Sequence, residues 1–291
     1  MTIDVALITG SESSTGEFAV GEVHGIDLAN LDDDQLLEVR RIVCDHEVVV
    51  FRGQSLDPGS QSRFSRRLGP SAETPFITTM SDHPDVIRVV KEADEGAAFN
   101  FGGAWHSDFS FLEFPPSFTI LAAVDVPPRG GDTLFASMSR AWTVLPESTK
   151  LRLRDLDAVH TARDAYSRRM QPLHSGMRGM SIVCDDSADD ERRHPLVTTH
   201  PETGRSVLFF NRAYVRDLDG VPAHEIDGLL QFLHDHTTSE AFSASNRYCS
   251  SRARSSCWAL TSASTSRSVT TRPGRPVPSS SMCPAAASIQ R

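Results

Sequence analysis

Apolar and polar positions alternate in a pattern typical of short strands between Gly/Pro turns, with amphipathic helices near both ends of the first 240 residues. Strands are expected over 21–28, 47–51, 86–90, 118–124, 133–136, 194–199 and 206–211. Helices are expected from residue 31 through the apolar stripe Leu36, Leu37, Val39, Ile42 and Val43, and over 59–68, 139–145, 148–156 and 223–237. This order favours a mainly β fold, a sandwich or barrel core with flanking helices.

The segment from Arg163 to Arg193 shows no period and is predicted to be a long loop. Long loops inside compact domains often cover binding sites. Its members Arg168, Arg169, Arg178, Met177 and Met180 could cover an anionic substrate. A solvated loop is the alternative.

The candidate chemistry lies in Trp105-His106-Ser107-Asp108. On a strand, residues i and i+2 share a face, so His106 and Asp108 could reach one metal ion. They would supply two thirds of a 2-His-1-carboxylate iron site. His83-Pro84-Asp85 and His200-Pro201-Glu202 have similar spacing, but their prolines indicate turns. The alternative for His106 is a core histidine hydrogen-bonded to Asp108.

Composition narrows the class of partner. A net charge of −9 argues against nucleic acid, and no apolar run is long enough for a membrane helix. The N-terminus does not resemble a signal peptide, and the five cysteines form no CxxC pair. We therefore expect reduced thiols, a cytoplasmic location and a small-molecule substrate. The sequence does not decide whether the protein forms a homo-oligomer.

The charge is distributed unevenly. Residues 243–291 carry seven Arg and neither acid nor Lys, so the preceding residues sum to −9 − 7 = −16. This Ser/Arg-rich segment has neither strand alternation nor helix period. We expect a domain over 1–242 and an anomalous tail over 243–291, either disordered or translated from a shifted reading frame.

Several motifs occur along the chain in an order that is typical of one enzyme family. They are the Trp105–Phe111 segment, Pro115-Pro116, Gly130-Gly131-Asp132-Thr133-Leu134-Phe135, His194–Val197, Thr199–Gly204 and Leu208–Asn211. From about residue 15 to Phe242, the chain resembles the TauD/TfdA family of iron(II)/2-oxoglutarate dioxygenases. The resemblance implies a double-stranded β-helix (jelly-roll) core, with His106 and Asp108 as the first two iron ligands. Thr133 matches the threonine that contacts the distal carboxylate of 2-oxoglutarate; its alternative role is to satisfy the preceding glycine turn.

The resemblance also implies the reaction. Iron(II), 2-oxoglutarate and O2 would hydroxylate a small, anionic organic substrate, with release of succinate and CO2. Taurine dioxygenases have Asn where this chain has Gly102, with Asn100 two positions earlier, and a His-Pro pair where it has Thr74-Pro75. Asn100 and Gly102 are therefore candidate substrate positions, and taurine itself is disfavoured.

The family's third ligand, a second His, and an Arg for 2-oxoglutarate lie near the C-terminus. This chain has no His after His236. In a shifted reading frame, the last base of codon 264 and the first two bases of codon 265 can encode His. This His would precede a newly encoded Arg by twelve positions, which matches the spacing between the second His ligand and the Arg in the family. We expect a core incomplete at its C-terminal strands, weak iron binding and little turnover. The rival function is a non-catalytic pseudoenzyme or β-helix binding module, which metal-dependent 2-oxoglutarate binding would distinguish.

Overall fold

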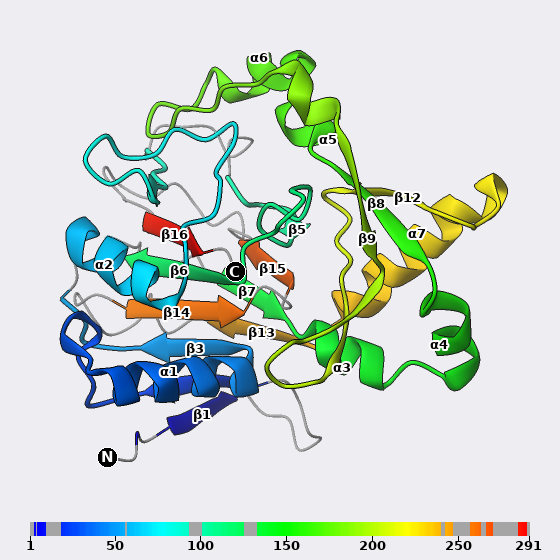
Figure 1. The fold of residues 1–291 in the computed structure, drawn as a ribbon. Helices are drawn as coiled ribbons and strands as arrows, with labels where there is room; N and C mark the ends of the chain where they lie inside the picture. Colours follow the sequence, from blue (N-terminus) through cyan, green and yellow to red (C-terminus); the bar gives the residue numbers. More distant parts are fainter. Residues whose placement is uncertain are drawn as a thin grey trace.

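The core consists of two facing β-sheets (Figure 1). The computed structural model describes residues 3, 5–9, 19–55, 57–92, 101–124, 133–239, 242–246, 257–262, 266–269 and 285–289. The larger sheet contains β1 (Val5–Thr9), β2 (Ala19–Val23), β3 (Val48–Phe51), β14 (Cys257–Ser262), β6 (Phe118–Ala123), β16 (Ala285–Ile289) and β4 (Val86–Arg88), in that order. The smaller sheet contains β13 (Ser243–Asn246), β7 (Thr133–Ala136), β15 (Ser266–Val269) and β5 (Trp105–His106).

Strand β3 of the larger sheet is apolar on both faces because each face meets a different layer. Val48 and Val50 of β3 pack with Leu121 of β6 against Phe135 of β7, between the two sheets. Val49 and Phe51 point to the other face and join the core beneath the helices. Continuous apolar runs are typical of strands buried on both sides. The mainly β sandwich with flanking helices is confirmed.

Two helices cover the outer face of the larger sheet, α1 (Asp33–His46) and α2 (Pro58–Leu68). A capping box between Asp32 and Gln35 fixes the start of α1. Val39, Ile42 and Val43 are buried as the stripe predicted. The inclusion of Leu37 was wrong, since its exposed fraction is 65%. Leu37 precedes Val39 by two positions, about 200° around the helix, and so faces solvent.

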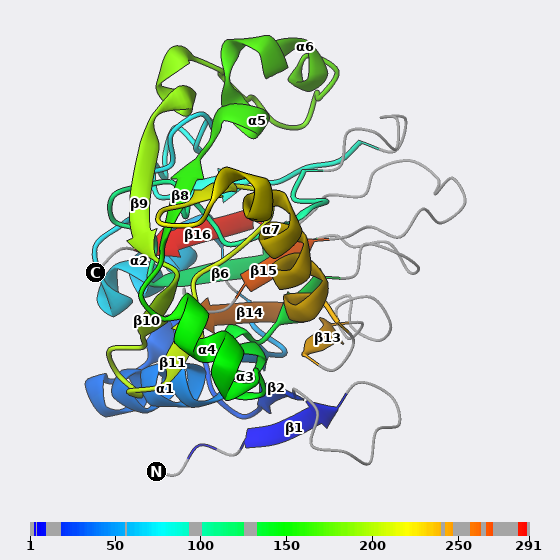
Figure 2. The same cartoon turned by 90° about the vertical axis from the view of Figure 1, so that its right-hand side faces the viewer.

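A second layer holds β8 (Asp157–Thr161), β9 (Glu191–Pro195) and β12 (Val215–Leu218), with the hairpin β10 (Val197–Thr199) and β11 (Ser206–Leu208). The helices α3 (Met138–Thr143), α4 (Glu147–Leu153) and α7 (Ala223–Thr237) accompany it (Figure 2). Leu229, Leu230 and Leu233 of α7 lie at helical spacing and are buried in its core.

The predicted long loop from Arg163 to Arg193 is instead a folded cap, and we call residues 162–190 the lid. It contains α5 (Arg163–Tyr166), α6 (Gln171–His174) and 3-10 turns over Arg168–Met170 and Asp186–Asp189. Figures 1 and 2 both show α5 and α6 at the end of the molecule opposite α1. Four-residue helices are too short for a periodic signal, so sequence patterns could not reveal them.

The described parts of the C-terminal segment differ from the expected incomplete sheet. β14 lies between β3 and β6, β16 lies between β6 and β4, and β15 lies between β7 and β5, all with antiparallel register. Backbone hydrogen bonds make these ladders and do not depend on side-chain identity, so a weakly patterned sequence can fill the positions. The boundary at residue 242 and the shifted reading frame stay predictions.

In the described part of the chain, none of the helices has the length and hydropathy required to span a bilayer. Cys44 and Cys184 are buried free thiols.

Candidate active site

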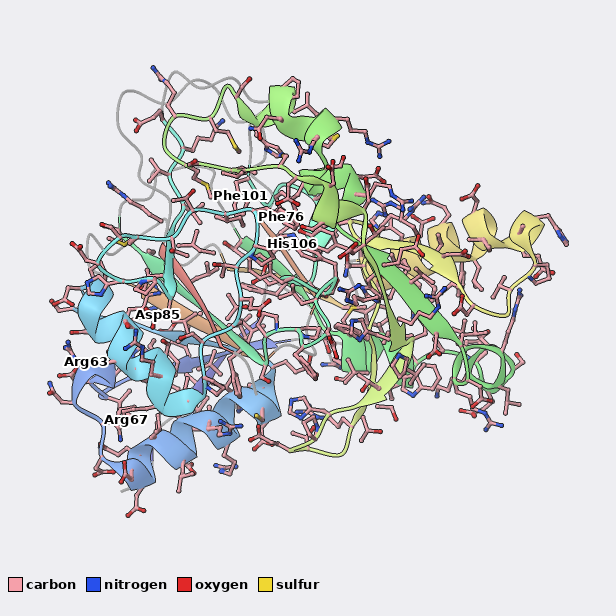
Figure 3. The ribbon with its side chains drawn as sticks, turned by 45° about the horizontal axis from the view of Figure 1, so that its top comes forward. Arg63, Arg67, Phe76, Asp85, Phe101 and His106 are labelled. Carbon is pink, nitrogen blue, oxygen red and sulfur yellow. The ribbon has the colours of Figure 1, made fainter. Side chains whose placement is uncertain are left out.

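A pocket of about 270 Å³ opens between the sandwich and the lid. Its wall combines the chain around His106 with lid residues and the turn before β12. Figure 3 labels His106 and Phe101, which share this wall, and shows Asp85 apart from them beside α2. The described wall is mostly apolar and consists of Ile77, Phe101, Gly102, Gly103, Ala104, His106, Asp108, Phe109, Ala165, Tyr166, Leu173, His174, Met177, Ala213 and Tyr214.

His106 and Asp108 meet on this wall, with 3.1 Å between His106 Nε2 and Asp108 Oδ1. The expectation that both lie on one strand was wrong. β5 ends at His106, and a turn follows in which Ser110 N donates to Ser107 O and Phe109 has a φ of 49°. The turn, rather than the i, i+2 rule, brings the carboxylate back toward the ring.

The hydrogen bonds fix which atoms face each other. The Nδ1 of His106 lies 2.7 Å from the carbonyl oxygen of Ala104, which can only accept, so Nδ1 carries a hydrogen. In a neutral ring, Nε2 then presents a lone pair to an ionised carboxylate, which is also only an acceptor. Two acceptors 3.1 Å apart require a proton or a cation between them. Donation from the second ring nitrogen to a carbonyl is typical of metal-binding histidines.

Thr119 orients the carboxylate. Its hydroxyl on β6 donates to Asp108 Oδ2 at 2.8 Å, which leaves Oδ1 turned toward His106. Sequence reasoning missed Thr119, although a threonine that is only 4% exposed within the apolar run Phe118–Ala123 was the available signal. Buried hydroxyls need a partner.

The other predicted positions have different outcomes. Thr133 begins β7, two residues before Phe135, which faces the space between the sheets. Thr133 therefore belongs to the inner face of its strand, although it is outside the described pocket wall. Gly102 lines the pocket with a φ of 70°. Asn100 lies outside the described residues.

A group of aromatic side chains surrounds the pair, and sequence reasoning missed it. Tyr166 of α5 and Tyr214 both line the pocket and are almost fully buried. Burial raises the pKa of Tyr166 to about 12 and the pKa of Tyr214 well above its usual value, and the charge of Asp108 acts in the same direction. Both phenols therefore stay protonated and able to donate. The two tyrosines are far apart in the sequence, so no local pattern could pair them.

The lid arginines do not reach the pocket. Arg168 pairs with Asp186 at 2.8 Å and Arg169 pairs with Asp164 at 2.5 Å, and both arginines are mostly exposed. The described wall includes Met177 but none of the lid arginines, and Met180 is buried in the aromatic core. The arginine side chains of the described lid therefore do not cover the pocket, as would be needed to bind an anionic substrate there.

The other two motifs of similar spacing, His83-Pro84-Asp85 and His200-Pro201-Glu202, lie in turns outside the described pocket wall. Asp85 accepts a hydrogen bond from Ser62 and pairs with Arg66 of α2 at 3.0 Å. His200 Nδ1 accepts from the backbone of Glu202 at 3.2 Å. Within the described residues, no three His, Cys, Asp or Glu side chains gather closely enough to hold a metal ion. The described residues therefore fit the expected metal site only in part, because they supply two ligands of the expected types, His106 and Asp108.

Comparisons with known proteins place these residues in context. Residues 11–249 match the family model described as "Taurine catabolism dioxygenase TauD, TfdA family". The 2,4-dichlorophenoxyacetate dioxygenase of Cupriavidus pinatubonensis is 31% identical over 255 residues, covering 79% of this chain and 83% of that protein. A Schizosaccharomyces pombe protein, named as an alpha-ketoglutarate-dependent sulfonate dioxygenase, is 32% identical over 223 residues. That match covers 74% of this chain, which spans only 54% of the yeast relative.

The fold has solved counterparts. A taurine dioxygenase from Burkholderia xenovorans superposes with a TM-score of 0.74 at 22% identity, covering 99% of this chain and 90% of the other. At this identity the likeness concerns the fold, which is the jelly roll that the motifs implied. The chain belongs to the TauD/TfdA family, whose enzymes are 2-oxoglutarate-dependent dioxygenases that use Fe(II) and O2.

Proposed function

We propose that this protein descends from, and retains the ligand-binding architecture of, an iron(II)/2-oxoglutarate-dependent oxygenase acting on a small organic anion. His106 and Asp108 would be two of the iron ligands. The observation that carries this proposal is the approach of His106 Nε2 to Asp108 Oδ1, at 3.1 Å, on the pocket wall. When bound, iron and 2-oxoglutarate would supply the oxidising chemistry for hydroxylation of an unactivated C–H bond.

The protein's own contribution is orientation. Ala104 O fixes the ring of His106 through Nδ1, and the Thr119 hydroxyl fixes one oxygen of Asp108. Such partners beyond the ligands set both ring tautomer and carboxylate angle. Thr133 on the inner face of β7 is proposed to contact the distal carboxylate of 2-oxoglutarate, and Gly102 and Asn100 are proposed substrate positions.

The substrate class is inferred from the relatives. Those named above act on a sulfonate and on 2,4-dichlorophenoxyacetate, and a Pseudomonas putida relative is named as a sulfate ester dioxygenase. All three substrates are small organic anions. We propose a substrate of this general kind, and we propose that turnover in this chain is low because a third ligand is missing from the described residues.

Metal binding and turnover test the proposal separately. Calorimetric titration with Mn(II) should show weak binding that His106→Ala and Asp108→Ala abolish. The matched control is His224→Ala, because that side chain on α7 is 83% exposed and remote from the pocket. Succinate formation from 2-oxoglutarate with Fe(II) and O2 should be slow and should disappear in the same two variants. Equal Mn(II) binding by the wild type and the two variants would contradict the ligand assignment.

A second function is favoured by one observation, the absence of a three-ligand group among the described residues. The chain would then be a non-catalytic binding module of the same fold. Binding of 2-oxoglutarate that does not depend on Mn(II), with no succinate formed, would support this alternative over the oxygenase.

A further inference from the structure

A second hollow of the surface lies between α4 and α7. This groove has a volume of about 550 Å³. Its lining includes Arg152 of α4 and Glu225, Gly228, Leu229 and Phe232 of α7. Figure 2 shows both helices on the face turned toward the viewer. The described walls of this groove and of the pocket under the lid have no residue in common, so the proposed oxygenase chemistry does not explain the groove.

Gly228 is a glycine that the fold of a single chain does not require. It lies in the middle of α7, where glycine is among the least favourable residues for a helix. A Cβ placed at this position would meet no atom of the described chain within 4 Å. A close approach within the described chain therefore does not explain the missing side chain. The glycine instead leaves an open position in the wall of the groove.

Phe232 lies one helical turn after Gly228 and is exposed for so large an apolar side chain. Its exposed fraction is 43%. The ring stacks on His236, in the following turn, at 5.9 Å with an interplanar angle of 11°, and it does not cover Gly228. Residues four apart in a helix lie on the same face. The groove therefore presents an aromatic knob and an open hole side by side.

The knob and the hole belong to a longer stripe on α7. Glu225, Gly228, Phe232 and Asp235 are spaced by three, four and three residues, which places them along one face of the helix. We call these four residues the α7 stripe. Its spacing is symmetric about its middle, so an antiparallel copy would set Phe232 of one chain against Gly228 of the other, and the reverse. A two-fold symmetric interface needs a surface that is self-complementary in this way.

The charges at the ends of the α7 stripe fit the same pairing. In the antiparallel arrangement, Glu225 would lie opposite Asp235 of the second copy, and these two carboxylates alone would repel each other. Arg152 forms an ion pair with Glu225, and the arginine side chain is 51% exposed. A guanidinium has five N–H donors, so Arg152 can contact both carboxylates. Each end of the interface would then combine one cation with two carboxylates.

We propose that the groove between α4 and α7 is a docking surface for a second copy of this chain. The dimer is antiparallel and two-fold symmetric, and Phe232 of each copy fills the open position at Gly228 of the other. The contact involves parts of two helices only, so the dimer is weak and depends on concentration. The proposal uses neither the metal site nor the oxygenase reaction, so their failure would not affect it.

Sedimentation velocity on the full chain, from about 1 to 200 µM, measures the monomer–dimer equilibrium. Phe232→Gln removes the ring and should weaken the dimer by about tenfold or more, as loss of a central aromatic anchor does. Gly228→Gln fills the open position and should weaken it by a similar factor. This variant should also raise the thermal midpoint, because glutamine favours a helix more than glycine does, so unfolding could not explain a lost dimer. Leu37→Gln on exposed α1 is the matched control.

The charged ends test the orientation of the two copies. Arg152→Glu puts three carboxylates at each end of the interface and should weaken the dimer by about tenfold or more. Adding Asp235→Lys returns each end to one cation and two carboxylates, and should restore the dissociation constant to within about threefold of the wild type. A wild-type chain that stays monomeric, a dimer unchanged in both α7 glutamine variants, an equal loss in Leu37→Gln, or no recovery in the double charge variant would each overturn the proposal.

Discussion

At the scale of single residues, His160 makes the stability of the fold depend on pH. Its side chain on β8 is fully buried, and its Nδ1 lies 3.0 Å from the Ser110 hydroxyl. Its ring stacks on Phe209 at 5.1 Å and meets His194 edge-on at 5.2 Å. Burial, with the nearby His194 as a smaller cause, lowers the pKa of His160 to about 3.

The pH dependence follows from the direction of that pKa shift. An unfolded histidine has a pKa of about 6.5, so below that pH the unfolded chain binds a proton that folded His160 does not. The free energy of unfolding should therefore fall as pH drops from 6.5 towards 3, by up to about 1.4 kcal/mol per pH unit. Urea unfolding at pH 7.5, 6 and 5 measures the slope. His160→Asn should be less stable at pH 7.5 yet show a shallower slope, whereas the exposed His224→Asn should keep the wild-type slope. An unchanged slope in His160→Asn would contradict the assignment.

At the scale of elements, the lid is held by hydrogen bonds that connect distant residues. Thr78 N donates to Ser181 O at 3.0 Å, and Val183 N donates to Phe76 O at 2.9 Å. Within the lid, Gln171 Nε2 donates to Ile182 O at 3.1 Å, and its Oε1 accepts from Cys184 N at 2.9 Å. These bonds keep the lid, with Tyr166 and His174, over the pocket.

Gln171→Met should loosen the lid without unfolding the domain. The replacement has similar length but leaves the Ile182 carbonyl and the Cys184 amide without their partner, at a cost of about 1–2 kcal/mol. Hydrogen exchange of amides 182–184 should become roughly tenfold faster, while exchange in α1 stays unchanged. The matched control is Gln231→Met, since Gln231 donates to Asp235 on the exposed surface of α7. Equal protection of 182–184 in both variants would show that the side chain does not hold the lid.

These elements show what sequence patterns could and could not predict. α1 and α7 were predictable because a cap and an apolar stripe are local signals. The identity of His106 and Asp108 as a pair was also predictable, but the turn that joins them was not, because it depends on local backbone geometry at Phe109. The lid and the tyrosine pair depend on contacts between distant residues, which leave no periodic trace in the chain.

At the scale of the whole molecule, the C-terminal segment decides whether the jelly roll can work as an oxygenase. β15 lies beside β5, with Arg267 as the register partner of His106. The third ligand of a facial triad has to approach His106 and Asp108 from a neighbouring part of the core. The present sequence has no His beyond His236 that could serve. The described strands of this segment join both core sheets, and we propose that the site lacks the second His ligand that this segment would be expected to supply.

We propose that residues 243–291 are read from a shifted frame, and restoring the frame should recover the site. In the alternative frame each codon takes the third base of one present codon and the first two bases of the next. The new chain would carry a His at the junction of codons 264 and 265, one or two positions before β15 begins at Ser266. We expect Mn(II) affinity to rise roughly a hundredfold or more, since third ligands contribute at least as much as the outer partners of a metal site.

The measurement compares the two full-length chains by Mn(II) calorimetry and by succinate formation. His106→Ala in the restored chain is the control, because it should remove the gain. The thermal midpoint of the restored chain should rise only when Mn(II) is added if the gain comes from the ligand, since a bound metal stabilises the folded state by mass action. Sequencing the gene across codons 240–291 provides the independent check. If the gene encodes no His in either frame there, or if the present chain already binds Mn(II) as tightly as the restored one, the reading-frame account fails and the non-catalytic function gains support.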